Sequence, residues 1–158
     1  KLFHLIELDL SMNNLSQINS NTFNDLKSLR YLNLSSNKLE FINMNQTNPL
    51  INLIIFDISD NRIKFLKGEL FSTLIYLFSL FLNDNLFEKI NNNTFTGFFL
   101  IKNIYISKEI FLSQNGENIN NLKNSFKFKL SRQVLEYTFF KSINVNFKEN
   151  NQNFSDKY

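Results

Sequence analysis

The sequence predicts an α/β-type solenoid: a curved, right-handed stack of turns with a parallel sheet of short strands on its concave face and irregular, 3-10 or helical segments on its convex face. Two observations predict this fold. A pattern of apolar residues with one asparagine recurs without a gap, and its step is the 24 residues from Leu5 to Leu29. Within each copy, polar and apolar residues alternate over a stretch that suits one short strand. With 158 residues, of which 43% are hydrophobic, the chain is long enough to bury a core.

Each copy of the repeat contains seven apolar positions and one asparagine. The first copy is Leu5, Leu8, Leu10, Asn13, Leu15, Ile18, Phe23 and Leu26. The copies that begin at Leu29, Leu53 and Leu77 keep the asparagine and every apolar position except one, which Thr47 occupies. A match of this consistency excludes coincidence, and a period of this length is typical of a solenoid.

The repeat fades toward the C-terminus. A fifth copy begins at Ile101 but has Glu109 where asparagine belongs, and the same frame places Phe128 and Leu130 at apolar positions of a much weaker sixth copy. We therefore divide the chain into repeats in residues 1–112, a degenerate repeat or C-terminal cap in residues 113–143, and a polar, poorly ordered tail in residues 144–158. The alternation of apolar and basic residues over 126–130 favours an edge strand that caps the stack; binding of anionic lipid or nucleic acid is the alternative.

The motif L-x-x-L-x-L-x-x-N-x-L from Leu5 to Leu15 resembles the leucine-rich repeat (LRR) family. The 24-residue length, together with Phe23, Phe71 and Phe95, is similar to the typical subclass of that family, which is common in receptor ectodomains and matrix proteins. The resemblance implies a piece of a Toll-like receptor or a related cell-surface receptor, with a role in signal transduction or innate immunity. An LRR-bearing G-protein-coupled receptor, a secreted matrix or guidance protein, a cytosolic adaptor or scaffold, and the binding part of a receptor kinase remain alternatives.

The alternation within each copy predicts which side chains face a partner. Leu8 and Leu10 point into the core, so Glu7 and Asp9 point outward, and the same places recur in every copy. The outward residues are Glu7, Asp9, Tyr31, Asn33, Ile55, Asp57, Ser79, Phe81, Asn103 and Tyr105. We expect a protein or microbial ligand to dock on this concave face, with Tyr31, Phe81 and Tyr105 beside Ile55 as an aromatic stripe. The acidic residues at its start would favour a basic partner.

The asparagine of each copy has a structural role. A turn that leaves a strand inside a core leaves backbone groups that need hydrogen-bond partners. An amide side chain both donates and accepts, so it suits the turn of its own repeat and that of the neighbouring repeat. We expect a ladder of Asn13, Asn37, Asn61 and Asn85 that ends at Glu109.

Catalytic chemistry has few candidates in this composition. The chain contains no cysteine and only one histidine, His4, and its three glycines are isolated, so we expect no metal site, no cofactor, no nucleotide site and no enzymatic activity. The net charge of +3 is mild, so we expect no nucleic-acid partner. The longest apolar stretch, over residues 74–82, is too short to span a membrane.

Localisation depends on the resemblance. We expect the chain to lie at the outer face of the plasma membrane or to be secreted, as in the receptors that it resembles; a cytoplasmic location is the alternative. We also expect it to be part of a longer protein, because it opens at Leu2 inside what would be the last turn of an earlier repeat. N-x-S/T sequons, which accept glycans in secreted proteins, occur at Asn14, Asn33, Asn45, Asn92 and Asn153. Their number is about what chance gives in a chain so rich in asparagine. A glycan on Asn33 would block the concave face, so glycosylation there and ligand binding exclude each other.

Overall fold

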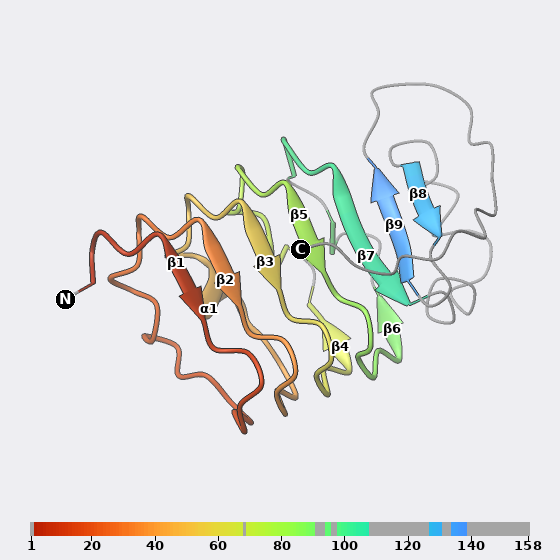
Figure 1. Cartoon of the computed structure of the whole chain (residues 1–158), viewed down its shortest axis with the longest axis horizontal. Helices are drawn as coiled ribbons and strands as arrows, with labels where there is room; N and C mark the ends of the chain where they lie inside the picture. Colours follow the sequence, from red (N-terminus) through yellow and green to blue (C-terminus); the bar gives the residue numbers. More distant parts are fainter. Residues whose placement is uncertain are drawn as a thin grey trace.

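The computed structural model describes residues 2–67, 69–90, 94–95, 98–107, 127–130 and 134–138. It confirms the solenoid, with about four turns stacked along one axis (Figure 1). Five short strands lie side by side in parallel, one from each repeat copy. They are β1 (Glu7–Asp9), β2 (Tyr31–Asn33), β3 (Ile55–Asp57), β5 (Ser79–Phe81) and β7 (Asn103–Ser107).

The register of the sheet follows the repeat without a shift. The central residues of the strands are directly opposite one another, in the order Leu8, Leu32, Phe56, Leu80 and Ile104. These side chains enter the core, and those of Leu32, Phe56, Leu80 and Ile104 are almost completely buried. Since every parallel pair has the same 24-residue step, each position of the repeat becomes a column that runs along the stack.

An antiparallel hairpin completes the sheet. β9 (Val134–Thr138) pairs with β7, and β8 (Lys127–Leu130) pairs with β9 and forms the edge of the seven-stranded sheet. β8 lies where the frame places the strand of a sixth copy, but it does not pair with β7, and its partner runs in the opposite direction. β8 therefore does not add the parallel strand of a further LRR turn, and it lies at the edge of the sheet, as predicted for residues 126–130. The division into a degenerate repeat or C-terminal cap in residues 113–143 stays a prediction. The predicted tail in residues 144–158 and Glu109 lie outside the described residues.

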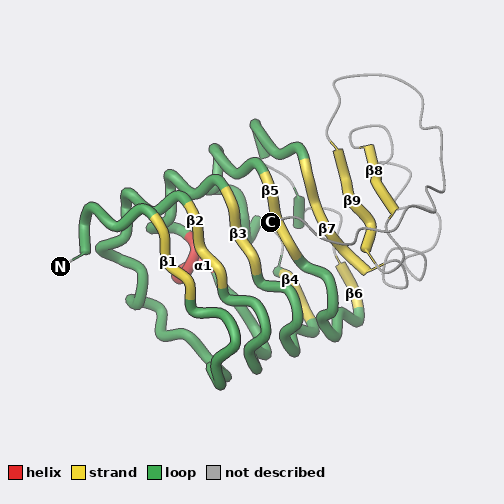
Figure 2. The backbone as a smooth tube through the Cα atoms, viewed as in Figure 1, coloured by secondary structure: helices red, strands yellow, loops and turns green. Residues whose placement is uncertain are grey.

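The side of the solenoid behind the sheet is mostly turns and loops (Figure 2). It contains one helical turn, α1 (Met44–Thr47), and a two-stranded parallel sheet of β4 (Phe65–Leu66) and β6 (Lys89–Ile90), which the sequence did not predict. Thr47 is buried although it interrupts the apolar pattern. Its hydroxyl donates a hydrogen bond to the carbonyl oxygen of Leu70 in the next repeat (2.9 Å), which satisfies the polar group.

One continuous apolar core runs through the stack. It contains the repeat leucines, isoleucines and phenylalanines, and Phe98 packs against both Phe71 and Phe95, with ring centroids 5.8 and 6.3 Å apart. Leu8 and Leu10 of the first copy are only partly buried, because no described repeat covers them on their outer side. No helix in the described part of the chain is long and apolar enough to cross a membrane.

The asparagines bridge neighbouring repeats after each strand. Asn61 is buried, and its Nδ2 donates to the carbonyl oxygen of Leu34 in the preceding repeat (3.0 Å) and to those of Ile58 (3.3 Å) and Ser59 (3.0 Å) in its own. Its Oδ1 accepts a hydrogen bond from the backbone nitrogen of Leu39 (2.9 Å). Asn37 and Asn85 make the same set of contacts one repeat away on either side. Asn13, in contrast, is exposed and donates to two carbonyls of its own repeat.

The turn that these asparagines close requires a left-handed residue. Met12, Ser36, Asp60 and Asp84 precede the four asparagines, and their φ angles are 54°, 54°, 50° and 55°. Aspartate and asparagine tolerate this conformation better than methionine or serine does. The last two repeats therefore carry a better residue for this turn than the first two.

Candidate functional site

Ten strand residues form two rows on the outer face of the parallel sheet, which we call the sheet face. The first row is Glu7, Tyr31, Ile55, Ser79 and Asn103. The second row is Asp9, Asn33, Asp57, Phe81 and Tyr105. Neighbours within a row come from adjacent parallel strands, which lie about 4.8 Å apart. The sheet therefore brings together all the residues that the sequence places on its concave face.

Exposure differs along the sheet face. Glu7 and Asp9 are exposed, and Tyr31 is 38% exposed. The remaining residues except Ser79 are partly buried. Ser79 is only 6% exposed, and its hydroxyl accepts a hydrogen bond from Nδ2 of Asn103 (3.0 Å). We expected Ser79 to meet a partner, but its small side chain is covered and engaged by its neighbour, so it is not available for contact.

The aromatic residues of the sheet face form a pair rather than an even stripe. The rings of Phe81 and Tyr105 stack with their centroids 4.2 Å apart and their planes 2° apart. Tyr31 lies in the other row, next to Ile55 and two strands away from Phe81. Ile55 and Phe81 are diagonal neighbours on adjacent strands, so an oblique line of apolar side chains crosses the sheet face.

The second row begins with three side chains that accept hydrogen bonds from a serine two residues later. Oδ1 of Asp57 accepts from both the backbone nitrogen (2.9 Å) and the hydroxyl (2.6 Å) of Ser59. Oδ1 of Asn33 accepts in the same way from Ser35, at 3.0 and 2.7 Å. Asp9 accepts from the backbone nitrogen of Ser11 at 2.8 Å. These contacts hold the three side chains at the ends of their strands.

The sequence analysis missed these serines. A signal was available, because D-x-S, N-x-S and D-x-S recur at Asp9, Asn33 and Asp57 with the 24-residue step of the repeat. The structure gives these serines a positioning role, since each one fixes the orientation of a polar side chain on the sheet face. The amide of Asn33, which is also part of a sequon, belongs to this row of fixed acceptors.

The two aspartates of the row have opposite pKa shifts. Burial raises the pKa of Asp57, although the hydrogen bonds from Ser59 oppose this effect, and the charge of Asp9 raises it further. Hydrogen bonds from Ser11 lower the pKa of Asp9, which is fully exposed. The carboxylate of Asp57 is therefore the less well solvated of the two. A cationic group from a ligand would relieve this unfavourable burial of charge.

The described residues hold no group of three or more histidine, cysteine, aspartate or glutamate side chains that could bind a metal ion. His4 is exposed near the N-terminal end of the described residues. The geometry of the sheet face is that of a row of fixed acceptors beside a stacked aromatic pair, which is suited to binding a surface.

A family model described as leucine rich repeat matches residues 2–50, the part of the chain that contains β1 and β2. The chain is a leucine-rich repeat solenoid. It is similar to a solved structure of the TLR13–ssRNA13 complex, with 31% sequence identity and a TM-score of 0.61, over 67% of this chain and 15% of that chain. It is also similar to the structure of the Toll–Spätzle complex from Drosophila, with 25% identity and a TM-score of 0.61, over 65% of this chain and 14% of that chain. Comparison with curated proteins gives no match.

The LRR chain thus resembles Toll-like receptors, as the sequence predicted, but it spans only a small part of their length. The similarity to TLR13 corrects one expectation. We excluded nucleic acid because the net charge is mild, yet a solenoid of this fold is solved in complex with single-stranded RNA. Net charge is a poor guide here, because a ligand meets one face of a solenoid and responds to the charges of that face.

Proposed function

We propose that this LRR chain binds a protein or microbial ligand through its sheet face, as part of a cell-surface receptor of the Toll-like kind. The stacked pair of Phe81 and Tyr105 beside Asp57 is the observation that carries this proposal. Aromatic side chains dominate the free energy of many interfaces, because each one buries a large area with little loss of side-chain entropy. A stacked pair is fixed before the ligand arrives, which lowers the entropic cost further.

The charges of the sheet face indicate the chemistry of the ligand. Glu7 and Asp9 lie on the first parallel strand and Asp57 on the third, and none of the ten residues in the two rows is basic. A ligand with one or more cations next to an apolar group would pair with these acids and cover the aromatic rings. The partly buried Asp57 would contribute most, because its charge is the least satisfied by water.

The receptor role is inferred from the likeness to Toll-like receptors. The Drosophila neighbour is described as a hub in development and innate immunity, and it is solved with its protein partner Spätzle. Extracellular placement of this chain, glycosylation at sequons other than Asn33 of the sheet face, and a non-enzymatic role are parts of the same proposal. The secreted and cytosolic LRR alternatives would use the sheet face in the same way, so binding can be tested independently of them.

Random peptides displayed on phage, selected on the immobilised full chain, test the binding proposal. We expect a group of peptides that combine lysine or arginine with apolar residues, and whose affinity falls at least about tenfold on a chain with Phe81→Ala and Tyr105→Ala. Phe65→Ala is the matched control, because Phe65 is an exposed phenylalanine of β4 and lies outside the sheet face. Circular dichroism should show that all variants remain folded. If every selected peptide bound the double variant as tightly as the unmodified chain, the sheet face would not be the binding site.

A further inference from the structure

A second surface of the molecule exposes apolar side chains where polar ones are normal. Just before β1, β2, β3 and β5 the backbone makes a tight turn, closed by a hydrogen bond between leucines three residues apart, such as Leu53 N to Leu50 O and Leu77 N to Leu74 O (both 3.0 Å). The two middle residues of such a turn point to solvent and are usually polar. Here the middle residues include Ile51, Ile75 and Tyr76.

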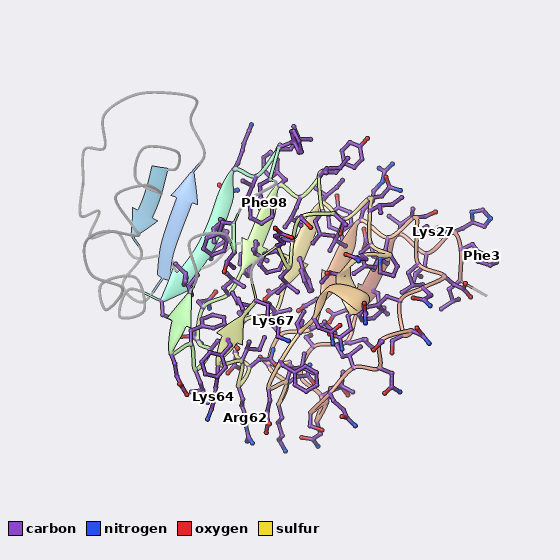
Figure 3. All side chains as sticks on the ribbon, turned by 180° about the vertical axis from the view of Figure 1, so that it is seen from behind. Phe3, Lys27, Arg62, Lys64, Lys67 and Phe98 are labelled. Carbon is purple, nitrogen blue, oxygen red and sulfur yellow. The ribbon has the colours of Figure 1, made fainter. Side chains whose placement is uncertain are left out.

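These turns lie in register along one edge of the stack. Ile75 is 39% exposed and Tyr76 48%, and Phe99, at the matching position of the fifth copy, is 73% exposed. The residues that directly precede the strands continue the surface, because their backbones form a ladder: Ile54 N donates to Arg30 O, Phe78 N to Ile54 O and Lys102 N to Phe78 O, at 2.8 to 2.9 Å. We call this surface the turn edge. Figure 3 shows Phe3, Lys27 and Phe98 toward this edge and Arg62 and Lys64 at the opposite one.

The turn edge is mostly apolar, and its charged side chains are all basic. Its exposed apolar side chains are Phe3, Ile6, Ile51, Ile75, Tyr76, Phe78, Phe99 and Leu100. Its cations are Lys27, Arg30 and Lys102, and Nζ of Lys102 lies 4.9 Å from the centre of the Phe78 ring. No acidic residue occupies the two middle positions of any of these turns or the position before any parallel strand, and no sequon falls there.

We propose that the turn edge is a second docking surface, which binds a protein surface that has an apolar centre and acidic side chains around it. Exposed apolar patches flanked by charge mark interaction sites, because burying them recovers the hydrophobic free energy that exposure loses. The three cations without an acidic neighbour on the edge select a partner of opposite charge. The sheet face has the opposite preference, so the two surfaces would not compete for the same ligand.

Charge also argues against the other occupants of this edge. A second copy of the chain in a twofold dimer through this edge would bring two surfaces that are both basic against each other, which costs free energy. Recognition of anionic lipid headgroups uses clusters of about four to eight basic residues, more than this edge offers. Apolar side chains outnumber cations on the turn edge, which favours the desolvated centre of a protein interface.

The same phage selection tests this proposal separately from the sheet face. The turn-edge variant carries Ile75→Ser, Tyr76→Ser and Phe99→Ser, and the matched control carries Phe41→Ser, Phe65→Ser and Leu86→Ser, which are similarly exposed elsewhere. We expect a second group of peptides, rich in aspartate or glutamate and in aromatic or aliphatic residues. Their affinity should fall at least about tenfold on the turn-edge variant and several-fold on a chain with Lys27→Gln, Arg30→Gln and Lys102→Gln. The matched control and the sheet-face variant should bind them normally.

Three results would overturn the proposal. The first is a selection without any peptide that is sensitive to the turn-edge variant. The second is a sensitive group that is neutral or basic. The third is evidence that something other than a protein partner occupies the turn edge. It would be dimerisation in sedimentation velocity, binding to phosphatidylcholine vesicles that contain phosphatidylserine, or binding to polyuridine RNA. In each case the turn-edge variant would abolish the effect and the matched control would retain it.

Discussion

Replacing Asn61 by alanine should strongly destabilise the solenoid. Its amide bridges two repeats with four hydrogen bonds, three donated by Nδ2 and one accepted by Oδ1. The residue is buried, so water cannot replace these contacts without opening the turn. Alanine would leave the N–H of Leu39 and the carbonyls of Ile58 and Ser59 without this partner.

The cost can be worked out from the groups left behind. An unsatisfied buried backbone group costs about 1–3 kcal/mol, and each lost net hydrogen bond about 1 kcal/mol. The N–H of Leu39 takes the full penalty. Each of the three carbonyls keeps another donor: Leu34 keeps the amide of Asn37 (3.1 Å), Ile58 that of Asn85 (2.8 Å), and Ser59 the backbone nitrogen of Ser36 (3.1 Å). We therefore expect a total loss of about 3–4 kcal/mol, a large part of the roughly 5–15 kcal/mol of a typical domain.

Urea unfolding followed by far-ultraviolet circular dichroism measures this loss. With a slope of about 2 kcal/mol per molar urea, Asn61→Ala should lower the midpoint by about 1.5–2 M. Asn13→Ala is the matched control, because Asn13 occupies the same place in the first copy but is exposed and donates to its own repeat. We expect its midpoint to fall by less than about 0.5 M. Equal losses for the two variants would refute the bridging role of the asparagine column.

Three further variants test other parts of the structure. Leu34→Asp places a charge where the native side chain is fully buried and should unfold the stack, at a cost of about 3–5 kcal/mol or more, visible as a loss of cooperative thermal unfolding; a folded, cooperative mutant would refute the repeat frame. Met12→Asn should stabilise the chain by about 0.5–1 kcal/mol in urea unfolding, because asparagine tolerates the φ angle of 54° better than methionine, and an unchanged midpoint would show that this turn is not strained. Asp57→Asn should raise the melting temperature at pH 7. Burial raises the pKa of Asp57, so the unmodified chain loses stability as the pH rises from the ordinary pKa of 3.8 through the raised pKa. The gain in melting temperature from Asp57→Asn should therefore vanish below pH 3.8. Asp9→Asn is its control. The lowered pKa of Asp9 means that its carboxylate adds stability above its ordinary pKa, and this stability is lost as the pH falls through the lowered pKa. A higher melting temperature for Asp9→Asn at pH 7 would contradict these opposite pKa shifts.

The repeat period was enough to predict the parallel sheet to the residue. Once Leu8 and Leu32 are known to be equivalent, a solenoid places them opposite each other, and the structure has this register. The direction of side chains in the strands follows from the same period, because alternate residues face opposite sides of a sheet. The aromatic stripe was harder to predict, since the row to which each residue belongs decides whether two rings meet. Phe81 and Tyr105 share a row and stack, whereas Tyr31 does not.

The elements that the sequence did not reveal depend on contacts outside the period. The apolar and basic alternation predicted an edge strand at β8, but not β9 or the antiparallel direction of the hairpin, because a frame that assumes one parallel strand per copy cannot show such a reversal. The two residues of β4 are too few to leave a periodic signal. Ser79 lies at an outward place of its strand but is covered, because a small side chain between larger neighbours has little access to solvent.

The repeat explains how one short chain can carry two surfaces of opposite charge preference. Every position of the repeat forms its own column, and a core residue such as Leu77 separates the middle residues of each turn from the strand that follows. A substitution in a turn, such as Ile75, therefore changes the turn edge without touching the rows that contain Asp57 and Phe81. Substitutions at the middle positions of the turns therefore leave the acidic side chains of the sheet face in place. This independence predicts that the losses of affinity caused by the sheet-face and turn-edge variants will each be confined to their own group of peptides, and that a chain with both sets of changes will show the two losses without any coupling between them.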